Sequence, residues 1–451
     1  MQSIVEAQKT YFKTHETKSY QHRLEALTRL ERLILDNEEA IKEALKADLN
    51  KSSFESYTTE IGFTLHSLKK AKKHLKGWMK PKKQRTPMYL GFTKSYIRHE
   101  PKGTVLIIGP YNYPFQLVVE PLIGAIAAGN TVIIKPSEFP ERTETLIERI
   151  INDAFDSRHV HVITGGKETT QELLDIPFDH IFFTGSTRVG QLVYEAAAKH
   201  LTPVTLELGG KTPTIVHKDA KLDVAARRIA FGKLLNAGQT CIAPDHIYVH
   251  AEIQEAFTQK LIQTIDEFYT SQKDEYPTII NDRHFERVRA LIDTKKLLYG
   301  GSVDAQRRFI EPTVLGAADE SDASMQEEIF GPVLPIIPYG DLDDLIESLG
   351  EKPSPLALYV FSENKNVQTK VFERLRFGGG AINDTIMHVA NPHMPFGGVG
   401  QSGMGRYHGR YSFETLSNAK AYVKKSTRID PSIAYPPFSR KKERLVKKIL
   451  K

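Results

Sequence analysis

The only cysteine of the chain, Cys241, lies in a segment that does not read as a core strand or helix. Its neighbours in NAGQTCIAPDH include Gly238 and Pro244, which favour loops. A free cysteine is often a small apolar core residue, but that role calls for an apolar stripe that this segment lacks. A thiol is about a few per cent thiolate at neutral pH, enough to attack a carbonyl when a second group assists it. Cys241 is therefore a candidate nucleophile.

Two further side chains could assist such a thiol. None of the sixteen histidines stands in a context typical of cysteine proteases. Glu207 in TLELGGK ends an apolar strand at two glycines and could act as a general base. The alternative is a buried salt bridge between Glu207 and Lys211. Asn112 in GPYNYP lies between prolines after a strand, where its amide could donate to an oxyanion, although asparagine in a turn is commonly only a turn residue.

A strand-to-helix turn in HIFFTGSTRVGQLVYEAA could bind a phosphate. The strand runs into Gly185 and Ser186 and a helix follows, so backbone N–H groups could meet a pyrophosphate; a plain helix cap is at least as good an interpretation. Lys135 at the end of TVIIK and Glu138 could hold a ribose or form a surface ion pair. The G-x-G-x-x-G match over 398–403 has neither strand nor helix in place and predicts no dinucleotide site.

The elements that must position these residues follow an alternating pattern. Helical spacing dominates residues 1–84, and from residue 103 the runs TVLIIG, TVIIK, VHVIT, HIFFTG and VTLELGG predict strands separated by helices. This rhythm is typical of a parallel sheet with helices on its faces. The pattern repeats after residue 209, with a helix predicted over 225–236, and then HIYVH, PVLPII and LALYVF as strands. The sequence thus predicts two α/β domains, with strand-like pieces at 95–100 and 421–425 as candidates for a small bridging sheet.

Composition narrows the class of protein. Of 451 residues, 40% are apolar and 26% charged, which excludes a disordered chain. No apolar run reaches the roughly 20 residues of a membrane span, and the N-terminus does not resemble a signal peptide, so we expect a cytoplasmic protein. The last twelve residues carry seven cations and one acid, leaving 54 of each sign elsewhere, so nucleic-acid binding is not predicted. The sequence has no cluster of Cys and His residues, so a metal site is not predicted either.

Several motifs occur together in a characteristic order. They are PYNYP, KPSE, FTGSTRVG, LELGGK, GQTC and EEIFGPV, followed by PFGGVGQSGMGRYHG. Over residues 5–437 the chain resembles the aldehyde dehydrogenase superfamily, and within it the group of class 3 and fatty-aldehyde members. The resemblance implies a Rossmann-type cofactor domain, a second α/β catalytic domain and a bridging sheet. It also implies oxidation of a medium- or long-chain aliphatic, or an aromatic, aldehyde to the acid, with NAD or NADP, through a cysteine thiohemiacetal and thioester.

The resemblance also assigns roles to residues. Cys241 matches the nucleophile, Glu207 the general base and Asn112 the oxyanion donor, with Tyr111 where many relatives have tryptophan. The cofactor contacts that it implies are Lys135 and Glu138 at the adenosine ribose, Gly185 and Ser186 at the pyrophosphate, and Glu328 and Phe330 at the nicotinamide end. Glu138 would repel a 2'-phosphate, yet the group is known for accepting both dinucleotides.

The implied organisation has four parts. We expect a dinucleotide-binding domain over 1–84 and 101–208, a catalytic domain over 209–415, bridging strands over 85–100 and 416–430, and a basic amphipathic tail over 438–451. A homodimer is expected from the resemblance. The tail places Leu445, Val446, Ile449 and Leu450 on one helical stripe, suited to weak contact with a membrane surface or to docking on its own dimer.

Two rival functions remain at this level. One is an acylating dehydrogenase that passes the thioester to coenzyme A; Glu207 argues for water, because a hydrolytic base would destroy a thioester that must survive. The other is a non-catalytic binding protein on the same fold, which the joint presence of Cys241, Glu207 and Asn112 disfavours.

Overall fold

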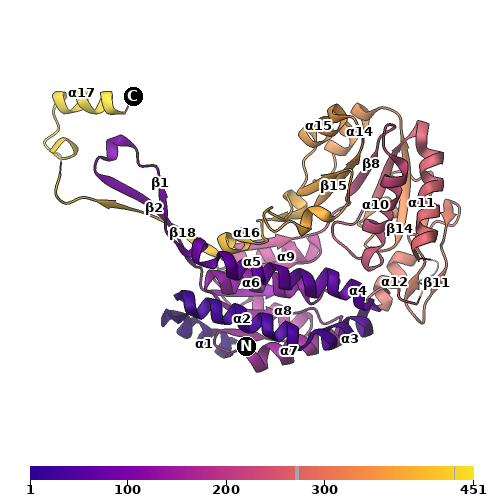
Figure 1. The fold of residues 1–451 in the computed structure, drawn as a ribbon, viewed down its shortest axis with the longest axis horizontal. Coiled ribbons are helices and arrows are strands. Elements are labelled where there is room, and N and C mark those ends of the chain that lie inside the picture. Colours follow the sequence, from indigo (N-terminus) through magenta and orange to yellow (C-terminus); the bar gives the residue numbers. More distant parts are fainter. Residues whose placement is uncertain (270–273, 431, 451) are drawn as a thin grey trace.

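Two open sheets with helices on their faces form the body of the molecule, and a narrow arm extends from it (Figure 1). The computed structural model describes residues 1–269, 274–430 and 432–450. The predicted fold class, α/β with a small additional sheet, is confirmed.

The first sheet has the strand order β17-β7-β6-β3-β4-β5. Its strands are β3 (Thr104–Ile108), β4 (Thr131–Lys135), β5 (Val160–Val162), β6 (His180–Thr184), β7 (Val204–Glu207) and β17 (Gly403–Met404). The connecting helices are α6 (Gln116–Ala128), α7 (Glu141–Ala154), α8 (Lys167–Leu174) and α9 (Thr187–Ala198). Strands β3, β4 and β6 are buried along their whole length, which explains their continuous apolar sequences.

The order of the first sheet creates a crevice at one edge. The chain runs from β3 to β4 and β5 on one side, and then returns to place β6 on the other side of β3. In the parallel register Ile108 lies opposite both Lys135 and Phe183. The segments that follow these three strands therefore emerge together, at a switch point where open α/β sheets bind ligands.

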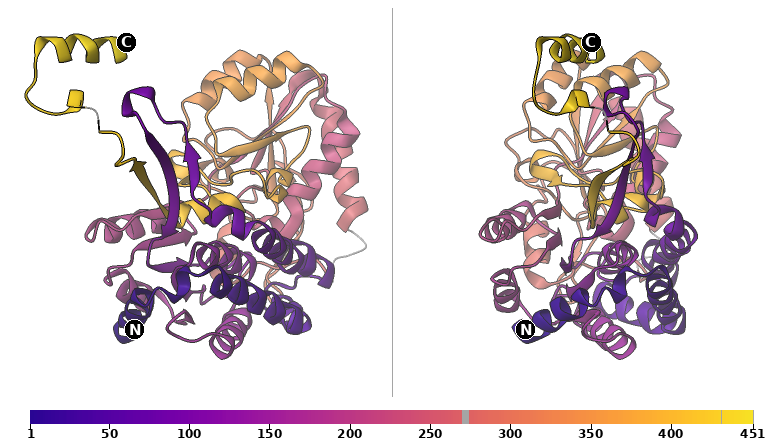
Figure 2. Two further views of the ribbon diagram at one scale, coloured as in Figure 1. Left: turned by 60° about the vertical axis from the view of Figure 1, so that its left-hand side comes forward. Right: turned by 90° about the vertical axis from the view of Figure 1, so that its left-hand side faces the viewer.

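The N-terminal helices cover one side of the first sheet (Figures 1 and 2). They are α2 (Tyr20–Asp36), α3 (Glu38–Leu49), α4 (Ser53–Ser56) and α5 (Gly62–Met79), whereas α1 (Gln2–Lys13) packs on the opposite face of the sheet through Val5. The predicted helical stripe is confirmed, because Leu27, Leu30, Ile34, Ile41 and Leu45 are all buried. These helices add apolar surface to one continuous core cluster that includes residues of both sheets.

The second sheet has the strand order β10-β13-β14-β9-β8-β15-β16. Its strands are β8 (Pro213–Val216), β9 (His246–His250), β10 (Leu297–Tyr299), β13 (Thr313–Leu315), β14 (Val333–Tyr339), β15 (Ala357–Phe361) and β16 (Gly379–Ile382); β11 (Val303–Asp304) and β12 (Phe309–Ile310) form a separate pair. The helices of this part are α10 (Leu222–Leu234), α11 (Gln254–Tyr269), α12 (Asp282–Arg289), α13 (Ala323–Gln326), α14 (Leu342–Gly350) and α15 (Lys365–Arg374), whereas α16 (Arg410–Thr415) packs on α6 of the first part.

One predicted boundary in this region is wrong. The helix expected over 225–236 ends at Leu234, because Asn236 and Ala237 take left-handed backbone angles, with φ of 54° and 52°. The chain turns there into the loop that carries Cys241. An asparagine tolerates this conformation better than most residues, so the change of direction has a local cause.

The arm is an antiparallel sheet of β1 (Lys82–Gln84), β2 (Thr93–Pro101) and β18 (Ser417–Lys425). The predicted strand pieces at 95–100 and 421–425 lie in β2 and β18 and pair with each other. Beyond the arm the chain ends in α17 (Arg440–Ile449), which lies away from the body (Figure 2). Within the described residues, no helix is long and apolar enough to cross a bilayer.

Candidate functional site

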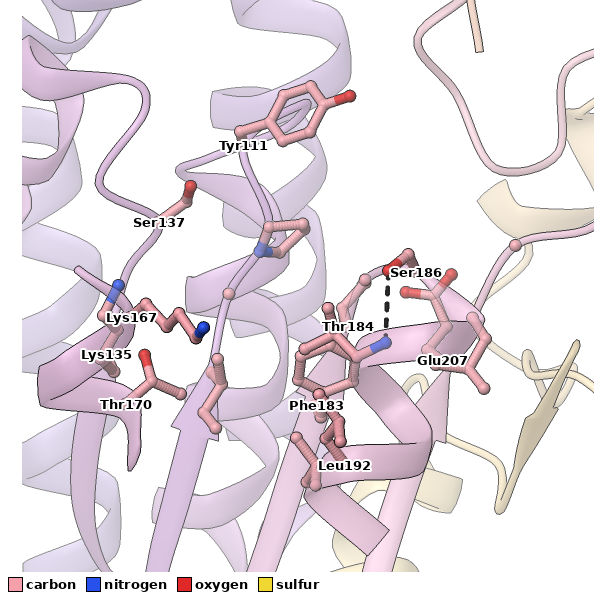
Figure 3. A pocket seen from close by; sticks show the side chains of 18 of the residues that line it. Tyr111, Lys135, Ser137, Lys167, Thr170, Phe183, Thr184, Ser186, Leu192 and Glu207 are labelled. Carbon is pink, nitrogen blue, oxygen red and sulfur yellow. Dashed lines mark hydrogen bonds between the residues drawn. The ribbon is translucent and has the colours of Figure 1, made fainter. Parts of the chain in front are cut away.

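A cavity of about 990 Å³ opens at the carboxyl edge of the first sheet and reaches residues of the second. Its volume is typical of sites that hold cofactors and other small molecules. The structure brings together at its wall all nine residues predicted from the sequence, which are Asn112, Lys135, Glu138, Gly185, Ser186, Glu207, Cys241, Glu328 and Phe330. Figure 3 shows part of this wall, with Lys135 at the end of β4, Ser186 just after β6 and Glu207 at the end of β7.

Cys241 and Glu207 are in direct contact within this cavity. Cys241 Sγ donates a hydrogen bond of 3.2 Å to Glu207 Oε1. Glu207 is the last residue of β7 and is only 1% exposed, whereas Cys241 is partly buried in the loop that precedes β9. A thiol and a carboxylate so placed can exchange a proton without an intervening group.

The Glu207 carboxyl is tuned by its surroundings. Burial raises its pKa to about 7. Hydrogen bonds from Cys241 and Tyr407 act in the opposite direction and limit the rise. Tyr407 OH lies 3.4 Å from Glu207 Oε2, brought there by β17, which pairs antiparallel with β7. A carboxyl with this pKa can both accept and release a proton near neutral pH.

The loop that carries Cys241 is rigidly held. The buried Gln239 side chain donates to Asn236 O at 3.1 Å and Thr278 O at 3.0 Å, and accepts from Ile280 N at 3.1 Å. Burial and the neighbouring Glu207 carboxylate raise the pKa of the Cys241 thiol well above its usual range. The thiol is therefore protonated at rest, with its proton directed at Glu207.

Asn112 is fixed at the end of the segment that follows β3. Its Nδ2 donates to Gln239 O at 2.9 Å, which ties it to the cysteine loop. Its main-chain oxygen accepts from Asn236 Nδ2 at 2.8 Å and from Lys51 Nζ at 3.1 Å. Since a side-chain amide has two N–H donors, the second remains for a ligand.

A fully buried ion pair supports the Asn112 segment from behind. Lys51 Nζ contacts Glu60 Oε1 at 2.5 Å, with both side chains inaccessible. Glu60 Oε2 also accepts from the backbone N–H groups of Phe115 and Gln116, at the start of α6. The Lys51 ammonium lies 4.0 Å from the centre of the Tyr113 ring. Buried charges that are paired in this way hold the chain in one geometry.

The turn after β6 is shaped for close approach of a ligand. Ser186 caps α9 by accepting a hydrogen bond from Val189 N at 3.4 Å, the dashed line in Figure 3. A Cβ on Gly185 would lie 2.6 Å from the Phe183 ring, so any other residue there would displace this ring. Lys135 Nζ contacts Glu138 Oε2 at 2.8 Å beside this turn. The helix N-terminus and this pair are the arrangement that a dinucleotide requires.

The segment of Glu328 is anchored by a buried network. Lys211 Nζ contacts Asp245 Oδ2 at 2.5 Å and donates to the main-chain oxygens of Ser324 and Glu327 at 2.8 and 2.9 Å. Asp245 Oδ1 in turn accepts from Ile329 N at 2.8 Å. The sequence-based alternative of a Glu207–Lys211 salt bridge is therefore wrong, because Lys211 is committed to a different carboxylate.

This network predicts a large effect on stability. Burial would raise the pKa of Asp245, but the Lys211 ammonium and a hydrogen bond from His246 hold it well below its usual value. The carboxylate thus stabilises the fold above the unfolded-state pKa of about 3.9, and this contribution is lost as the pH falls. Asp245→Asn should lower the free energy of unfolding at pH 7 by about 3 kcal/mol, since it leaves buried cations unpaired.

Urea denaturation checks this expectation, with Asp343→Asn as the matched control. Asp343 is exposed and pairs with Lys370 and Arg374 at the surface, where solvent screens the charges, so its loss should barely change the free energy of unfolding. Equal unfolding midpoints for the two variants at pH 7 would contradict the assignment. The difference between them should shrink only below about pH 4.

Sequence reasoning missed several residues that the structure places at or behind the cavity. Tyr407 belongs to the quoted motif GRYHG, but nothing local indicates that it reaches Glu207. Lys51 lies between α3 and α4, and Glu60 in the helical turn Tyr57–Ile61, both without any motif; Asp245 follows the cysteine loop without a sign of its partner. Among the described residues, no three His, Cys, Asp or Glu side chains gather as metal ligands would.

Comparisons with known proteins agree with this geometry. The aldehyde dehydrogenase family model matches residues 1–422. The chain is 52% identical to the 4,4'-diaponeurosporen-aldehyde dehydrogenase of Staphylococcus aureus, over 96% of this chain and 95% of that protein. It is 45% identical to a mouse enzyme named "aldehyde dehydrogenase, dimeric NADP-preferring", over 98% and 99%.

Among solved structures, the substrate-bound state of Staphylococcus aureus AldH superposes with a TM-score of 0.98 at 50% identity, covering 100% of this chain and 99% of that one. The protein is thus an NAD- or NADP-dependent oxidoreductase that converts aldehydes to carboxylic acids. The resemblance seen in the motifs is confirmed, and the chain belongs to the aldehyde dehydrogenase family.

Proposed function

We propose that Cys241 attacks the carbonyl carbon of the aldehyde and that Glu207 takes the thiol proton. The hydrogen bond of 3.2 Å between Cys241 Sγ and Glu207 Oε1 carries this proposal. With a pKa of about 7, Glu207 can accept this proton near neutral pH. Sulfur then forms a bond to the carbonyl carbon, and the carbonyl oxygen becomes an oxyanion.

Asn112 is the proposed donor to this oxyanion, together with the backbone N–H of Cys241. The Asn112 amide already donates one hydrogen bond to Gln239 O, and its second N–H is available. The contacts of Lys51 and Asn236 to the Asn112 main chain fix the amide before a substrate arrives. A donor fixed in this way stabilises the developing charge without having to reorganise.

A dinucleotide fits the rest of the cavity. When bound, NAD or NADP supplies the hydride acceptor for the oxidation. Lys135 and Glu138 would hold the adenosine ribose, and Gly185 and Ser186 the pyrophosphate. Glu328 and Phe330 would flank the nicotinamide end of the cavity. The Glu328 carboxylate lies directly against the backbone of Gly209, since a Cβ on this glycine would be 2.0 Å from Glu328 Oε2.

Glu207 acts a second time when the cysteine carries an acyl group as a thioester. In the proposed step Glu207, which has first released the thiol proton to solvent, takes a proton from water. The water oxygen bonds to the thioester carbon, the carbon–sulfur bond breaks, and the departing thiolate takes the proton from Glu207. The carboxylic acid leaves and Cys241 regains its thiol. Analysis of products with and without coenzyme A tests this assignment: free acid formed at the same rate in both supports hydrolysis, and an acyl-coenzyme A product contradicts it.

The proposed substrates are medium- or long-chain aliphatic aldehydes, or aromatic ones. A second cavity of about 300 Å³ is lined by Phe63, Val389, Pro392 and His408, next to Tyr407. Phe63, Val389 and Pro392 on its wall can contact a hydrocarbon chain, beside the polar Thr58, His66 and Ser67, and the staphylococcal relative is named for 4,4'-diaponeurosporen-aldehyde. Steady-state kcat/KM on a series of aliphatic and aromatic aldehydes with each dinucleotide tests the class; a preference for short polar aldehydes would contradict it.

The pair of Lys135 and Glu138 predicts how the two dinucleotides are distinguished. The Glu138 carboxylate is partly exposed beside the proposed ribose site, where it would repel a 2'-phosphate. Glu138→Gln removes this charge, so the Kd for NADP should fall about fivefold relative to that for NAD. Fluorescence titration of the free enzyme measures both constants, with the exposed Glu141→Gln as the control variant. An unchanged ratio of the two constants would contradict the role of Glu138.

We further propose the domain organisation that the motifs imply. The first sheet with its helices (1–84 and 101–208) would bind the dinucleotide, 209–415 would carry the catalytic cysteine, and 85–100 and 416–430 would bridge subunits, followed by the tail over 438–451. A homodimer is supported by the name of the mouse relative and by the exposed strands of the arm. Sedimentation equilibrium should give twice the mass of the chain.

Location and surface contacts also belong to this proposal. A cytoplasmic location is supported by the need to keep a single nucleophilic thiol reduced. Weak contact of the tail with a membrane surface is supported by the exposed face of α17, where Leu445 and Ile449 are flanked by cations. Co-sedimentation of the full chain with vesicles, compared with a chain that ends at Ser439, tests this contact; equal pelleting would contradict it.

A further inference from the structure

A carboxylate of the N-terminal helices reaches across to the loop that carries the cysteine. Helix α4 lies at the end of these helices that is nearest the second sheet (Figure 1). Glu55 Oε1 of this helix accepts a hydrogen bond of 2.8 Å from Asn236 N, 181 positions away in the chain. Asn236 is fully buried and lies where the chain leaves α10 and turns toward Cys241. A side chain of the first part therefore holds the start of the cysteine loop.

The local sequence alone would give Glu55 a different partner. Ser52 and Glu55 have the S-x-x-E spacing of a capping box, in which the glutamate side chain usually returns to the amide of the capping serine. Ser52 makes its half of this motif, because its Oγ accepts from Glu55 N at 3.1 Å. The Glu55 carboxylate, however, is directed at Asn236 N. The side chain thus serves the cysteine loop and not its own helix.

Asn236 connects this contact with both groups of the proposed chemistry. Its φ of 54° is uncommon for a residue other than glycine, so its contacts must hold the turn. Its Nδ2 donates to Asn112 O at 2.8 Å and to Gln239 O at 3.1 Å. Gln239 O also accepts from Asn112 Nδ2, and Cys241 follows two positions later. A shift of the Asn236 backbone would therefore move the oxyanion donor and the thiol relative to each other.

The carboxyl of Glu55 is enclosed where it meets this turn. Burial raises its pKa to about 7, while the Lys51 ammonium and the hydrogen bond from Asn236 N lower it. Removal of the carboxylate would leave the buried amide of Asn236 without this acceptor, and an unpaired buried N–H costs free energy. The turn would then relax toward another geometry.

We propose that Glu55 is a positioning residue for the oxidation of aldehydes. By holding the amide of Asn236, it keeps the Cys241 thiol and the Asn112 side chain at the separation that attack on a carbonyl requires. The inference rests on the proposed roles of Cys241 and Asn112. A displacement of reacting groups by about 1 Å can slow an enzyme about 100-fold, so this contact affects the rate beyond its effect on stability.

Steady-state and binding measurements on variants of the full-length protein test the inference. Glu55→Ala should lower kcat by about 30-fold at saturating NAD, because the thiol and the oxyanion donor lose their alignment. The Kd for NAD should stay within about twofold of that of the unmodified protein. Glu55→Gln retains an oxygen that can accept from Asn236 N, so its kcat should stay within about threefold of the unmodified value.

Alkylation of the thiol gives a readout that needs neither aldehyde nor dinucleotide. Cys241 is the only cysteine, so mass spectrometry after treatment with iodoacetamide reports on this residue alone. Burial and the Glu207 carboxylate suppress its thiolate in the unmodified protein. In Glu55→Ala the loosened loop should release the thiol from both effects, and alkylation at pH 7 should be about tenfold faster. Glu55→Gln should be alkylated at the unmodified rate.

Asp48→Ala is the matched control. Asp48 is also partly buried, and its carboxylate accepts from the backbone amides of Arg142 and Thr143 at 3.1 and 2.8 Å, away from the cysteine loop. Its loss should lower the free energy of unfolding but change neither the alkylation rate nor kcat at saturating NAD. If Glu55→Ala does not fold, Glu55→Asp carries the test, because it keeps the charge but withdraws the acceptor from Asn236.

The outcomes separate this inference from the proposed function. Alkylation of Glu55→Ala at the unmodified rate would overturn the role of Glu55 alone. The same changes in Asp48→Ala would also overturn it, because general destabilisation would then explain them. Faster alkylation of Glu55→Ala with an unchanged kcat would refute the proposed role of Cys241 and, with it, this inference.

Discussion

Cys241→Ser is expected to lower the kcat for aldehyde oxidation by about 10⁴-fold or more. A serine hydroxyl can keep the contact with Glu207 that the thiol makes at 3.2 Å, so the site should retain its shape. The hydroxyl, however, is a far weaker nucleophile and ionises much less readily. Cys241→Ala should be equally inactive, because no other thiol exists in the chain.

Two measurements are needed for this prediction. Absorbance of the reduced dinucleotide gives the rate, and fluorescence titration of the free enzyme gives the Kd for NAD. This Kd should stay within about twofold of that of the unmodified protein, because the proposed cofactor contacts lie elsewhere in the cavity. Loss of both activity and dinucleotide binding would indicate a damaged fold and not a missing nucleophile. Turnover close to that of the unmodified protein in Cys241→Ala would refute the assignment.

Glu207→Gln is expected to uncouple acylation from hydrolysis. The amide keeps the size of the side chain and its contact with Tyr407 but cannot accept a proton from water. The thiol can still lose its proton to solvent water, so acylation should slow less than hydrolysis, and a burst of reduced dinucleotide approaching one equivalent per active site should precede turnover about 10²- to 10³-fold slower. Rapid-mixing absorbance measures the burst, and mass spectrometry of the quenched enzyme should find the acyl group on Cys241.

The pH profile gives an independent test of the same residue. Because the base must be deprotonated, kcat should rise with pH through about 7, the pKa to which burial raises Glu207, and this limb should be absent in Glu207→Gln. Glu120→Gln is the matched control, since burial raises the pKa of Glu120 to about 7 as well, yet Glu120 does not line the large cavity. Only free enzyme in the mass spectrum under turnover, or loss of the limb in Glu120→Gln, would contradict the role of Glu207.

The residues of the site could be predicted from the sequence because each stands at the end of a recognisable apolar strand or in a recognisable loop. A buried parallel strand is a short apolar run, and the residues at its carboxyl end face the ligand crevice. Lys135 follows TVIIK and Ser186 follows HIFFT, so each could be predicted from its own segment. The loop of Cys241 was equally evident from its glycine and proline neighbours. The ordered motifs then joined these segments into one family.

Other features were beyond sequence reasoning because they depend on pairs of residues far apart in the chain. Tyr407 meets Glu207 across 200 positions, and Lys51 meets the Asn112 main chain across 61. The sequence left a salt bridge between Glu207 and Lys211 open as an alternative for the same reason, and the structure pairs Lys211 with Asp245. Whether a carboxyl is ionised at neutral pH follows from its burial and its partners, as the opposite pKa shifts of Glu207 and Asp245 demonstrate.

The amino-acid sequence by itself therefore determined which reactive side chains are present and in which order the apolar strand segments follow one another along the chain. The tertiary structure decided which of those groups touch, which are removed from water and which carry charge. The physical reason is that hydrophobic periodicity and turn preference act over a few residues, whereas desolvation and ion pairing arise only when the sheets and helices have packed.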